Sequence, residues 1–356
     1  MTNLQVHNII GLMSGTSGDG LDIAYCHFKK STDWSFQIVK AETLPFPEKL
    51  GKDLSNSHLM SALDLSILDV AFGKWMGEVT NDFVLKYQID VQAIASHGHT
   101  VFHQPQKGLS LQIGNGWAMH VASGLPVIND FRMLDVQLGG QGAPLVPIGD
   151  ELLFSDFDYC INLGGIANIS MNVSGQRRAF DICPFNLLLN HYAKSQGQPY
   201  DQGGGLARSG KVIPQMLDKL NAIPYYKIDG AKSLGREDVE EFFQIIDSGK
   251  FIDPKDKLRT IVEHSIFQIK SIIKKEGKLL LTGGGAFNTF FVEQLKKALG
   301  ESIVIPETDS TLINFKEALI FAFLGVQRMR KENNSLASVT GANQDSCGGI
   351  LYGFIE

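Results

Sequence analysis

The chain has 356 residues, of which 44% are hydrophobic and 20% are charged, and its formal net charge is −6. A chain longer than about 300 residues exceeds what one hydrophobic core usually supports, so the length predicts two domains. The net charge is acidic and the sequence shows no basic patch, which argues against a nucleic-acid-binding protein. No apolar run approaches the roughly 18 residues that a membrane helix needs.

The N-terminus and the cysteines indicate a cytoplasmic chain. Residues 1–15 lack the charged start, long apolar core and small-residue cleavage site of a signal peptide. The cysteines lie far apart and form no C-x-x-C pair, so neither a zinc site nor a disulfide framework is expected for Cys26, Cys160, Cys183 and Cys347. We therefore expect a reducing compartment and no membrane partner.

The first half of the chain alternates strand and helix patterns. An apolar strand at 7–13 runs into a turn of small residues at 14–20 and returns at 21–28, and a helical spacing of apolar residues covers 59–87. Such alternation is typical of an α/β fold with a mixed sheet covered by helices. Further strands are predicted at 36–42, 91–95 and 126–128, and a helix is predicted at 116–123.

The second half begins in the same way. A strand at 159–163, a Gly-Gly turn and a returning strand at 166–173 repeat the opening pattern, which is a weak internal repeat on the scale of a domain. We predict two similar domains, 1–132 plus 333–356 and 133–332, meeting at a cleft on which both turns open. Other strands are predicted at 178–181, 278–281 and 302–305, and helices at 187–195, 259–275, 289–299 and 314–329.

The first turn has the composition of a phosphate-binding hairpin. It is not a Walker A loop because the Gly-Lys-Ser/Thr ending is absent. Small residues let backbone N–H groups face an anion, hydroxyl groups add donors, and Asp19 or Asp22 is a candidate ligand for Mg²⁺. The alternative is a plain β-hairpin turn. The candidate residues are Gly15, Thr16, Ser17, Gly18, Asp19, Gly20, Leu21 and Asp22.

Two further glycine turns are candidates for nucleotide binding. Gly164 and Gly165 follow a strand, with Asn168 shortly after them, although a bulged hairpin would look the same. Gly283, Gly284 and Gly285 end a strand just before a helix, and Asn288 follows. Ligands of open α/β sheets bind beyond the carboxyl ends of strands, where a helix N-terminus also favours phosphate.

Single polar residues at strand ends are candidates for catalysis and substrate binding. Asp181 ends a predicted strand and suits a general base, or it caps the helix that follows. Arg132 follows another strand, and its planar guanidinium group suits bidentate binding of a carboxylate or phosphate. His97 and Thr100 are expected to hydrogen-bond a substrate, whereas His99 and His103 have the alternative of a structural role. Glu317 opens a late helix, where a first-turn acid would also be favourable.

These segments together resemble the anhydro-N-acetylmuramic acid kinase family. The matching stretches follow the order of the family and span nearly the whole chain. They are GLMSGTSGDGLDIA (11–24), SHGHT (96–100), LQIGNG (111–116), DFR (130–132), GGQGAPLVP (139–147), NLGGIANIS (162–170), FDICPFN (180–186), KSLGRE (232–237), LTGGGAFN (281–288), EALIFAFL (317–324) and SVTGA (338–342).

The resemblance implies two RNase-H-like domains of the actin/hexokinase type, ATP with Mg²⁺, and usually a homodimer. The reaction would convert ATP, 1,6-anhydro-N-acetylmuramate and water into N-acetylmuramate 6-phosphate and ADP, in recycling of peptidoglycan. The stretch 15–22 would bind the ATP phosphates, Asp181 matches the catalytic aspartate of the family, and Thr100, Arg132 and Glu317 match positions expected near the sugar.

The chain also departs from the family pattern at three places. Gly18 stands where leucine is common, and His99 stands where glutamine is common. The largest departure is Cys183-Pro184-Phe185-Asn186 in place of Gly-Pro-Gly-Asn, and it predicts a differently shaped loop beside Asp181. The alternatives to the implied activity are another sugar or small-molecule kinase of the same superfamily, or a nucleotide-binding regulator without catalysis.

Overall fold

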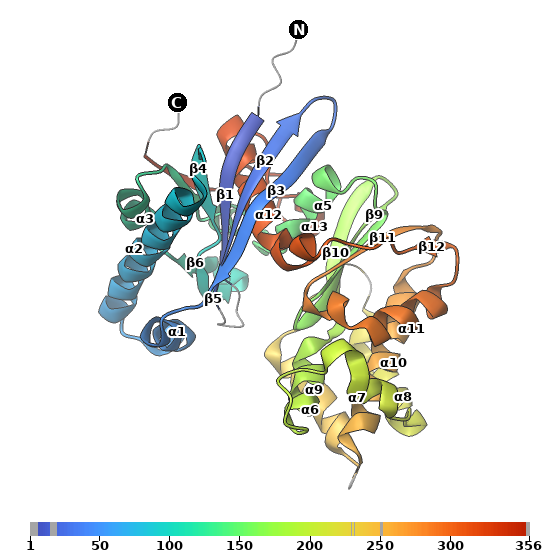
Figure 1. Cartoon of the computed structure of the whole chain (residues 1–356). Helices are drawn as coiled ribbons and strands as arrows, with labels where there is room; N and C mark the ends of the chain where they lie inside the picture. The colour runs from blue at the N-terminus through green and yellow to red at the C-terminus, as the bar shows by residue number, and fades with distance from the viewer. Residues whose placement is uncertain (1–5, 15–19, 229, 231, 250–251, 354–356) are drawn as a thin grey trace. The chain divides into compact units, whose positions relative to one another are not determined.

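The structure is a computed structural model that describes residues 6–14, 20–228, 230, 232–249 and 252–353. The backbone divides into two compact units, residues 1–154 with 315–356 and residues 155–314. Figure 1 shows the first unit in blue and green with the red C-terminal segment, and the second in light green to orange.

The first unit contains a mixed sheet in the order β13-β7-β4-β1-β2-β3. Strands β1, β2 and β3 are antiparallel neighbours, whereas β4 runs parallel to β1 and β7 runs parallel to β4. The strands are β1 (Val6–Ser14), β2 (Leu21–Lys30), β3 (Trp34–Leu44), β4 (Ala93–Ser96), β7 (Val127–Asn129) and β13 (Ile350–Tyr352). The predicted strands of this half are confirmed, and β13 is an addition that the sequence did not indicate.

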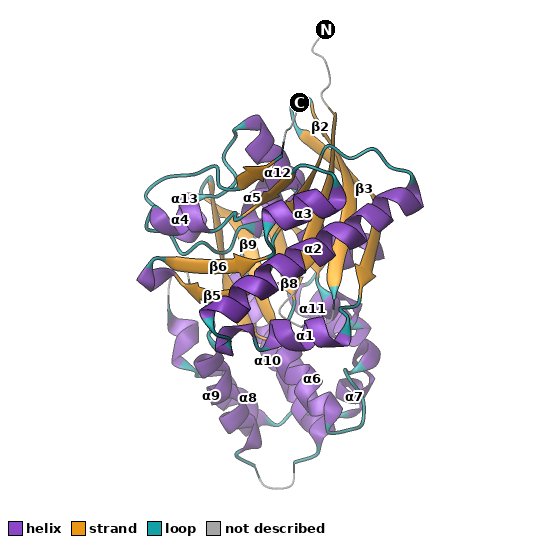
Figure 2. Cartoon of the chain, turned by 90° about the vertical axis from the view of Figure 1, so that its left-hand side faces the viewer, coloured by secondary structure: helices purple, strands orange, loops and turns teal. Residues whose placement is uncertain are grey.

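Helices α2 (Ala62–Tyr87) and α3 (Gly116–Ser123) cover one face of this sheet (Figure 2). Ser61 begins α2 by accepting a hydrogen bond from the Asp64 amide at 3.2 Å. Two glycines of α2 allow close contact with α3, because a Cβ atom at Gly77 would lie 2.5 Å from the Met119 carbonyl oxygen and one at Gly73 would overlap Asn115. The smaller elements of this unit are α1 (Glu48–Ser55), η1 (Ser57–Leu59), β5 (His99–Gln104), η2 (Pro105–Lys107), β6 (Leu109–Ile113), α4 (Met133–Gln137), α5 (Val146–Leu153) and α13 (Ala337–Thr340).

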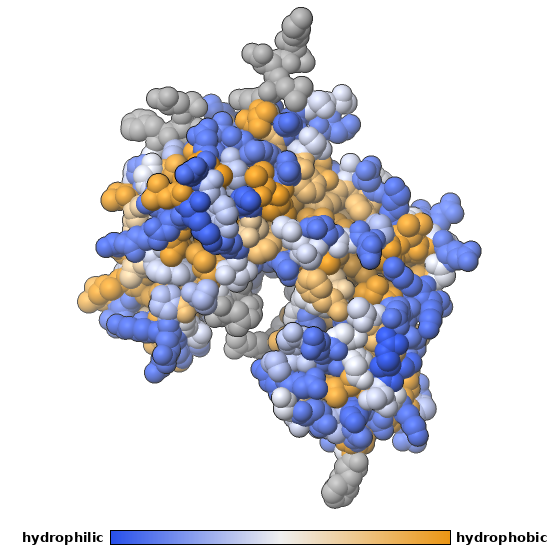
Figure 3. Space-filling model, in the orientation of Figure 1, coloured by the Kyte–Doolittle hydropathy of each residue, from blue (hydrophilic) through white to orange (hydrophobic). Residues whose placement is uncertain are grey.

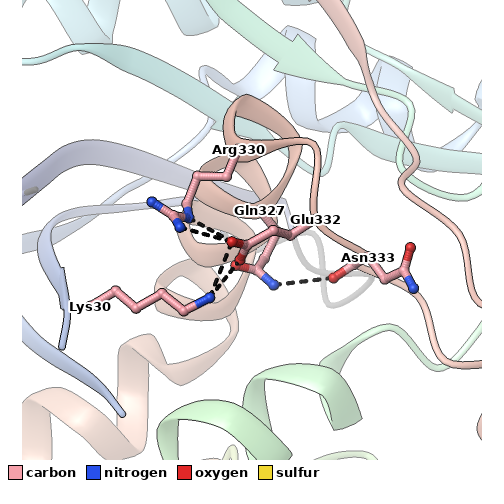
Figure 4. A network of polar contacts seen from close by, with 5 residues as sticks. All are labelled: Lys30, Gln327, Arg330, Glu332 and Asn333. Carbon is pink, nitrogen blue, oxygen red and sulfur yellow. Dashed lines mark hydrogen bonds and ion pairs between the residues drawn. The ribbon is translucent and has the colours of Figure 1, made fainter. Parts of the chain in front are cut away.

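The long helix α12 (Ser310–Arg330) packs on this sheet from residue 315 onward. A Cβ atom at Gly11 of β1 would overlap the Ala318 carbonyl oxygen, so only glycine lets helix and strand approach this closely. At the C-terminal end of α12, Glu332 accepts hydrogen bonds from Lys30 at 3.1 Å and from Arg330 at 2.8 Å (Figure 4). The bounds predicted at 132/133 and 332/333 therefore differ from those of the compact units, because α4, α5 and most of α12 belong with the first sheet.

The second unit repeats the same strand order as β10-β9-β8-β11-β12. Here β8, β9 and β10 are antiparallel neighbours, and β11 and β12 continue parallel to β8. The strands are β8 (Tyr159–Leu163), β9 (Ile166–Val173), β10 (Gln176–Pro184), β11 (Gly277–Thr282) and β12 (Ile303–Val304). The predicted internal repeat and the α/β fold with two RNase-H-like sheets are confirmed.

The helices of the second unit pack around the long helix α10 (Pro254–Ile272), which contributes Leu258, Ile261, Val262, Ile266 and Ile269 to the core. Asp253 begins α10 by accepting a hydrogen bond from the Lys255 amide at 2.9 Å. The others are α6 (Asn186–Lys194), η3 (Gln202–Gly204), α7 (Gly205–Ser209), α8 (Pro214–Asn221), η4 (Pro224–Lys227), α9 (Arg236–Asp247), η5 (Gly284–Phe287) and α11 (Thr289–Leu299).

All four cysteines are free thiols. Cys26, Cys160 and Cys183 are buried, whereas Cys347 is partly exposed. Burial raises the pKa of the Cys183 thiol to about 12. Within the described ranges, no helix is both long and apolar enough to cross a membrane.

Candidate active site

A row of polar residues crosses the second sheet at the level of Asp181. Asp181 of β10 is the cross-strand partner of Asn168 on β9, Asn168 is the partner of Asn162 on β8, and Asn162 is the partner of Thr282 on β11. Cross-strand partners place their side chains on the same face of a sheet, within reach of one another. Asn168, which we predicted as a nucleotide ligand, is therefore a direct neighbour of the candidate base.

The Asp181 carboxylate is held by the segment at 232–234. Its Oδ2 accepts a hydrogen bond from the Leu234 amide at 2.9 Å, and its own amide donates to the Lys232 carbonyl oxygen at 3.0 Å. The Tyr225 hydroxyl donates to the Asp181 carbonyl oxygen at 2.6 Å. Burial raises the pKa of the Asp181 carboxyl, and the Leu234 hydrogen bond opposes this effect only in part. A carboxylate with a raised pKa and a fixed orientation suits a general base.

The alternative that Asp181 caps the next helix is wrong. Helix α6 begins at Asn186, and Phe185 occupies its N-cap position without a side-chain hydrogen bond. A β-bulge between Asp181 and Cys183 interrupts the strand register just after the carboxylate. Bulges commonly re-aim a side chain next to an active site.

The two glycine turns of the second unit lie beside each other. They end the neighbouring parallel strands β8 and β11, whose register pairs Asn162 with Thr282. Gly283 has a φ of 78°, and a Cβ atom there would lie 2.9 Å from the Leu163 carbonyl carbon, so this close approach needs glycine. The prediction that Gly164 and Gly165 act with Gly283, Gly284 and Gly285 is compatible with this adjacency. The side chain of Asn288 caps α11 by accepting from the Phe291 amide at 3.0 Å.

Most of the first turn lies outside the described residues, namely Gly15, Thr16, Ser17, Gly18 and Asp19. The hairpin closes where Ser14 pairs with Leu21. The Leu21 side chain is fully buried in the core, so only its backbone is left for a ligand. Asp22 is half-buried and accepts a hydrogen bond from the Thr43 hydroxyl at 2.5 Å. Burial raises the pKa of the Asp22 carboxyl, and the Thr43 hydrogen bond opposes this effect.

In the first unit, Arg132 and His97 form a direct pair. The guanidinium donates from Nε and Nη2 to His97 Nε2 at 3.2 and 2.9 Å, and from Nη1 to the Gly142 carbonyl oxygen at 2.7 Å. His97 Nδ1 is 2.9 Å from the Gly98 carbonyl oxygen. Both ring nitrogens of His97 thus have protein partners. The ring holds the Arg132 guanidinium, and the direct hydrogen bond from His97 to a substrate stays a prediction.

Burial lowers the pKa of Arg132 to about 10, against the opposing charges of Glu317 and Asp135. An arginine with this pKa stays cationic at neutral pH. Glu317 is half-buried on α12, and it lies too far from Ser310 at the helix start to be a first-turn acid. The Thr100 hydroxyl accepts from Gln112 Nε2 at 3.3 Å. Thr100, Arg132 and Glu317, which we predicted to bind the substrate, all belong to the first unit.

The buried carboxylate of Asp135 was missed in the sequence. It accepts hydrogen bonds from the Gly142 amide at 2.7 Å, the Ser335 hydroxyl at 2.8 Å and the Thr340 hydroxyl at 2.7 Å. Because Gly142 also accepts from Arg132, Asp135 holds the loop that supports the guanidinium. The sequence shows only an acidic residue between the DFR motif and the glycine-rich loop. The hydroxyl groups that bind Asp135 lie about 200 residues later in the chain, so its role could not be recognised from nearby residues.

His99 of the SHGHT segment and His103, three residues beyond it, both have protein partners. His99 Nδ1 lies 3.3 Å from the Ser14 hydroxyl, and His103 Nδ1 lies 3.0 Å from the Ser110 hydroxyl on the neighbouring strand β6. Next to His97, at the ends of β4 and β7, a cavity of ≈ 350 Å³ is lined in part by Asp69, Asn115, Asn129, Asp130 and Tyr352. Asn115 and Asp130 stand in the stretches LQIGNG and DFR that resemble the family, but we predicted no role for any of these five residues.

Comparison with known proteins agrees with the motifs. Residues 7–353 match the profile of the family described as anhydro-N-acetylmuramic acid kinase. A relative of that name from Sulfurimonas denitrificans is 33% identical, with 96% of this chain and 98% of the relative covered. Another from Actinobacillus pleuropneumoniae serotype 3 is 32% identical, with 96% and 98% covered. A third, from Francisella tularensis subsp. novicida, is 33% identical, with 94% and 95% covered.

A solved structure, the activator of the 2-hydroxyisocaproyl-CoA dehydratase from Clostridium difficile, aligns with 91% of this chain at 12% identity. The alignment covers 97% of that chain, and its TM-score is 0.43. The family profile and the relatives extend over nearly the whole length of the chain. The chain therefore belongs to the anhydro-N-acetylmuramic acid kinase family.

Proposed function

We propose that this chain uses ATP and one water molecule to convert 1,6-anhydro-N-acetylmuramic acid into N-acetylmuramate 6-phosphate, as a step in recycling of peptidoglycan. Its membership of the family supports this activity. The observation that carries the assignment in this chain is Asp181, a half-buried carboxylate with a raised pKa that the Leu234 amide orients. A kinase that also hydrolyses the internal glycosidic bond between C1 and O6 needs such a base to activate water.

The reaction begins at Asp181. The carboxylate takes a proton from water as the water oxygen forms a bond to C1 of the sugar. The bond from C1 to O6 breaks, and its electron pair stays on O6. O6 then attacks the γ-phosphorus of ATP, and the bond to the β–γ bridging oxygen breaks to release ADP. Asp181 afterwards returns its proton to solvent. Asn168 lies beside the carboxylate and supplies an amide for holding the attacking water.

The substrate sugar carries a lactyl carboxylate, for which Arg132 is the best partner. Its guanidinium is cationic and held on one side by His97 and Gly142. A planar fork of this kind recognises carboxylates in a bidentate manner. Thr100 and Glu317 supply a hydroxyl and a carboxylate for the sugar hydroxyl and amide groups.

The ATP phosphates are assigned to backbone amides of the glycine turns. Gly164, Gly165 and Gly283–Gly285 end neighbouring parallel strands, where nucleotides commonly bind. The stretch 15–22 is assigned to the same role. Asp22 fits Mg²⁺ because it presents carboxylate oxygens, which this ion prefers, in a half-buried position at the end of that stretch. When bound with the nucleotide, Mg²⁺ would neutralise charge on the phosphate oxygens.

We also propose that the chain forms a homodimer and works in the cytoplasm, where ATP is available and its four free thiols stay reduced. Apolar side chains are exposed on one face of α2 and on the adjacent helix α3, and Figure 3 shows apolar patches over both. A surface of this kind favours a partner of the same chain. Its exposed residues are Leu63, Ile67, Val70, Trp117 and Val121.

The test is a coupled assay with ATP and 1,6-anhydro-N-acetylmuramate, followed by mass spectrometry of the product. We expect ADP and a sugar monophosphate in equal amounts. In ¹⁸O-labelled water the label should appear at C1. An unlabelled product would exclude direct attack of water on the ring, and an absence of phosphorylated sugar would contradict the proposed function. Sedimentation of the chain and of Val121→Glu tests the dimer.

A further inference from the structure

Phe185 is buried in the second unit at a position where the resembled family usually has glycine. Its φ is −124°, so the backbone does not use the left-handed conformation that favours glycine. The side chain turns into the core and is fully buried. Its ring packs edge-on against Phe291 of α11, with 4.7 Å between the ring centroids.

The Phe185 ring fills the space next to one of the glycine turns. A Cβ atom at Gly285 would overlap Cε1 of Phe185 and would lie 2.7 Å from the Leu163 Cβ. Gly285 belongs to η5 (Gly284–Phe287), which leads into α11. The ring therefore contacts both the turn and the helix that follows it.

The backbone next to Phe185 is bonded to the other glycine turn. The Phe185 amide donates to the Gly165 carbonyl oxygen at 2.8 Å, and the Asn186 amide donates to the Gly164 carbonyl oxygen at 3.1 Å. The Asn186 side chain donates to the Leu163 carbonyl oxygen at 3.0 Å. This short segment directly follows β10, the strand that carries Asp181.

We propose that Phe185 is a positioning residue that fixes both glycine turns relative to the strand of Asp181. The inference depends on the proposed function, in which these turns bind ATP and Asp181 activates water. Because packed interiors leave few voids, a smaller side chain at 185 would leave a cavity under Gly285. The turn would then relax toward the cavity, and the γ-phosphate would move away from its place in the reaction.

The experiment compares Phe185→Leu and Phe185→Met with Phe28→Leu. Phe28 is also fully buried, but it lies in the first unit on β2, at the end of the strand away from Asp22. We expect kcat/KM for ATP to fall about 10-fold in both variants at 185, since small misplacements of reacting groups are costly. KM for the sugar should stay within a factor of two. Phe28→Leu should lower the melting temperature and leave both kinetic constants unchanged.

Binding of ADP, measured by calorimetry, separates this inference from the proposed function. If the wild-type chain does not phosphorylate the sugar, the proposed activity fails. Weaker ADP binding in Phe185→Met than in Phe28→Leu would then still support the positioning role. ADP affinity and ATP kinetics equal to wild type in a folded Phe185 variant would overturn the inference. The same loss in Phe28→Leu would overturn it as well, because the effect would then follow from stability alone.

Discussion

Two nitrogen atoms of Arg132, Nε and Nη2, donate hydrogen bonds to the same atom, Nε2 of His97, at 3.2 and 2.9 Å. Because an arginine can only donate, His97 Nε2 is the acceptor, and its proton lies on Nδ1, toward the Gly98 carbonyl oxygen. Burial and the Arg132 charge hold the pKa of His97 well below its usual value. The imidazole is therefore neutral, and it orients the arginine without reducing its charge.

Replacing His97 by leucine should weaken sugar binding. The guanidinium loses an acceptor and is less well fixed for the carboxylate, so we expect KM for the sugar to rise about 10-fold, with KM for ATP unchanged. His97→Gln keeps an acceptor and should recover part of the loss. Steady-state kinetics with each substrate varied in turn provide the measurement. Equal effects on both substrates would contradict an orienting role.

The sugar affinity of the wild-type chain should not change between pH 6 and 8. A histidine with an ordinary pKa would titrate in this range, but His97 is held neutral throughout. Isothermal titration of the sugar at several pH values checks this expectation. A loss of affinity below pH 7 that His97→Gln removes would show that the histidine gains a proton after all.

Asp135→Asn should also disturb Arg132, through the loop at Gly142 that both residues contact. The amide group of asparagine would face the N–H and hydroxyl donors that the carboxylate now accepts. An unsatisfied buried donor costs about 1–3 kcal/mol, and the loop at Gly142 should shift with Arg132. We expect a lower melting temperature and a KM for the sugar raised about 10-fold. Ser335→Ala is the matched control, because it removes one donor and leaves the carboxylate intact.

The sequence predicted the two opening hairpins well because their signals are local. Apolar alternation and a turn of small residues are sufficient to place 7–28 and 159–173. The polar row at Asp181 is different, because Asn168 lies beside Asp181, and Asn162 beside Asn168, only through strand register. Register depends on pairing over long distances, and a single sequence does not encode it in any short window.

The predicted domain bounds differ from those of the compact units for the same reason. The apolar pattern of 314–329 predicts a helix but not the sheet on which it packs. That choice depends on Gly11, whose missing side chain admits the backbone of α12 at Ala318. Asp135 likewise meets Ser335 and Thr340 only after the chain has returned from the second unit.

Asp181→Asn should retain ADP binding and lose more than about 100-fold in kcat, as removal of a general base typically does. Asp218→Asn, at an exposed position of α8, is the control and should behave as wild type. Because burial raises the pKa of Asp181, the acidic limb of kcat/KM should lie above the pH of about 4 that is typical of a free aspartate. Turnover near that of wild type in Asp181→Asn would exclude its role as base.

The same substitution should not lower stability at neutral pH. A carboxyl group whose pKa is raised on folding favours the folded state below its unfolded pKa, and this contribution is lost as pH rises through the folded pKa. At pH 7 the charged carboxylate thus opposes folding, and asparagine removes that cost while still accepting from the Leu234 amide. Thermal melts should show a melting temperature for Asp181→Asn at or above wild type at pH 7. This advantage should disappear near pH 3.

Lys316 and Asp150 form a buried ion pair at 2.6 Å in the first unit, directly before Glu317. Lys316→Met would leave the Asp150 charge uncompensated, which typically costs about 3–5 kcal/mol, whereas Lys316→Met with Asp150→Leu should recover most of the loss. Arg208→Met breaks a half-exposed pair with Glu293 and should cost less than about 1 kcal/mol. Urea denaturation measures all three, and equal losses in both single variants would contradict the expected dependence on burial.

The distribution of the thiols makes Cys347 a ready attachment point for a spectroscopic label. The other three sulfur atoms are shielded from reagents, and burial further suppresses the thiolate form at Cys26 and Cys183 by raising the pKa of each. A maleimide dye should therefore couple to one position without any engineered mutation. Cys347 follows the segment whose Ser335 and Thr340 hydroxyl groups bind Asp135. The fluorescence of a dye at Cys347 should therefore change when a sugar binds near Arg132.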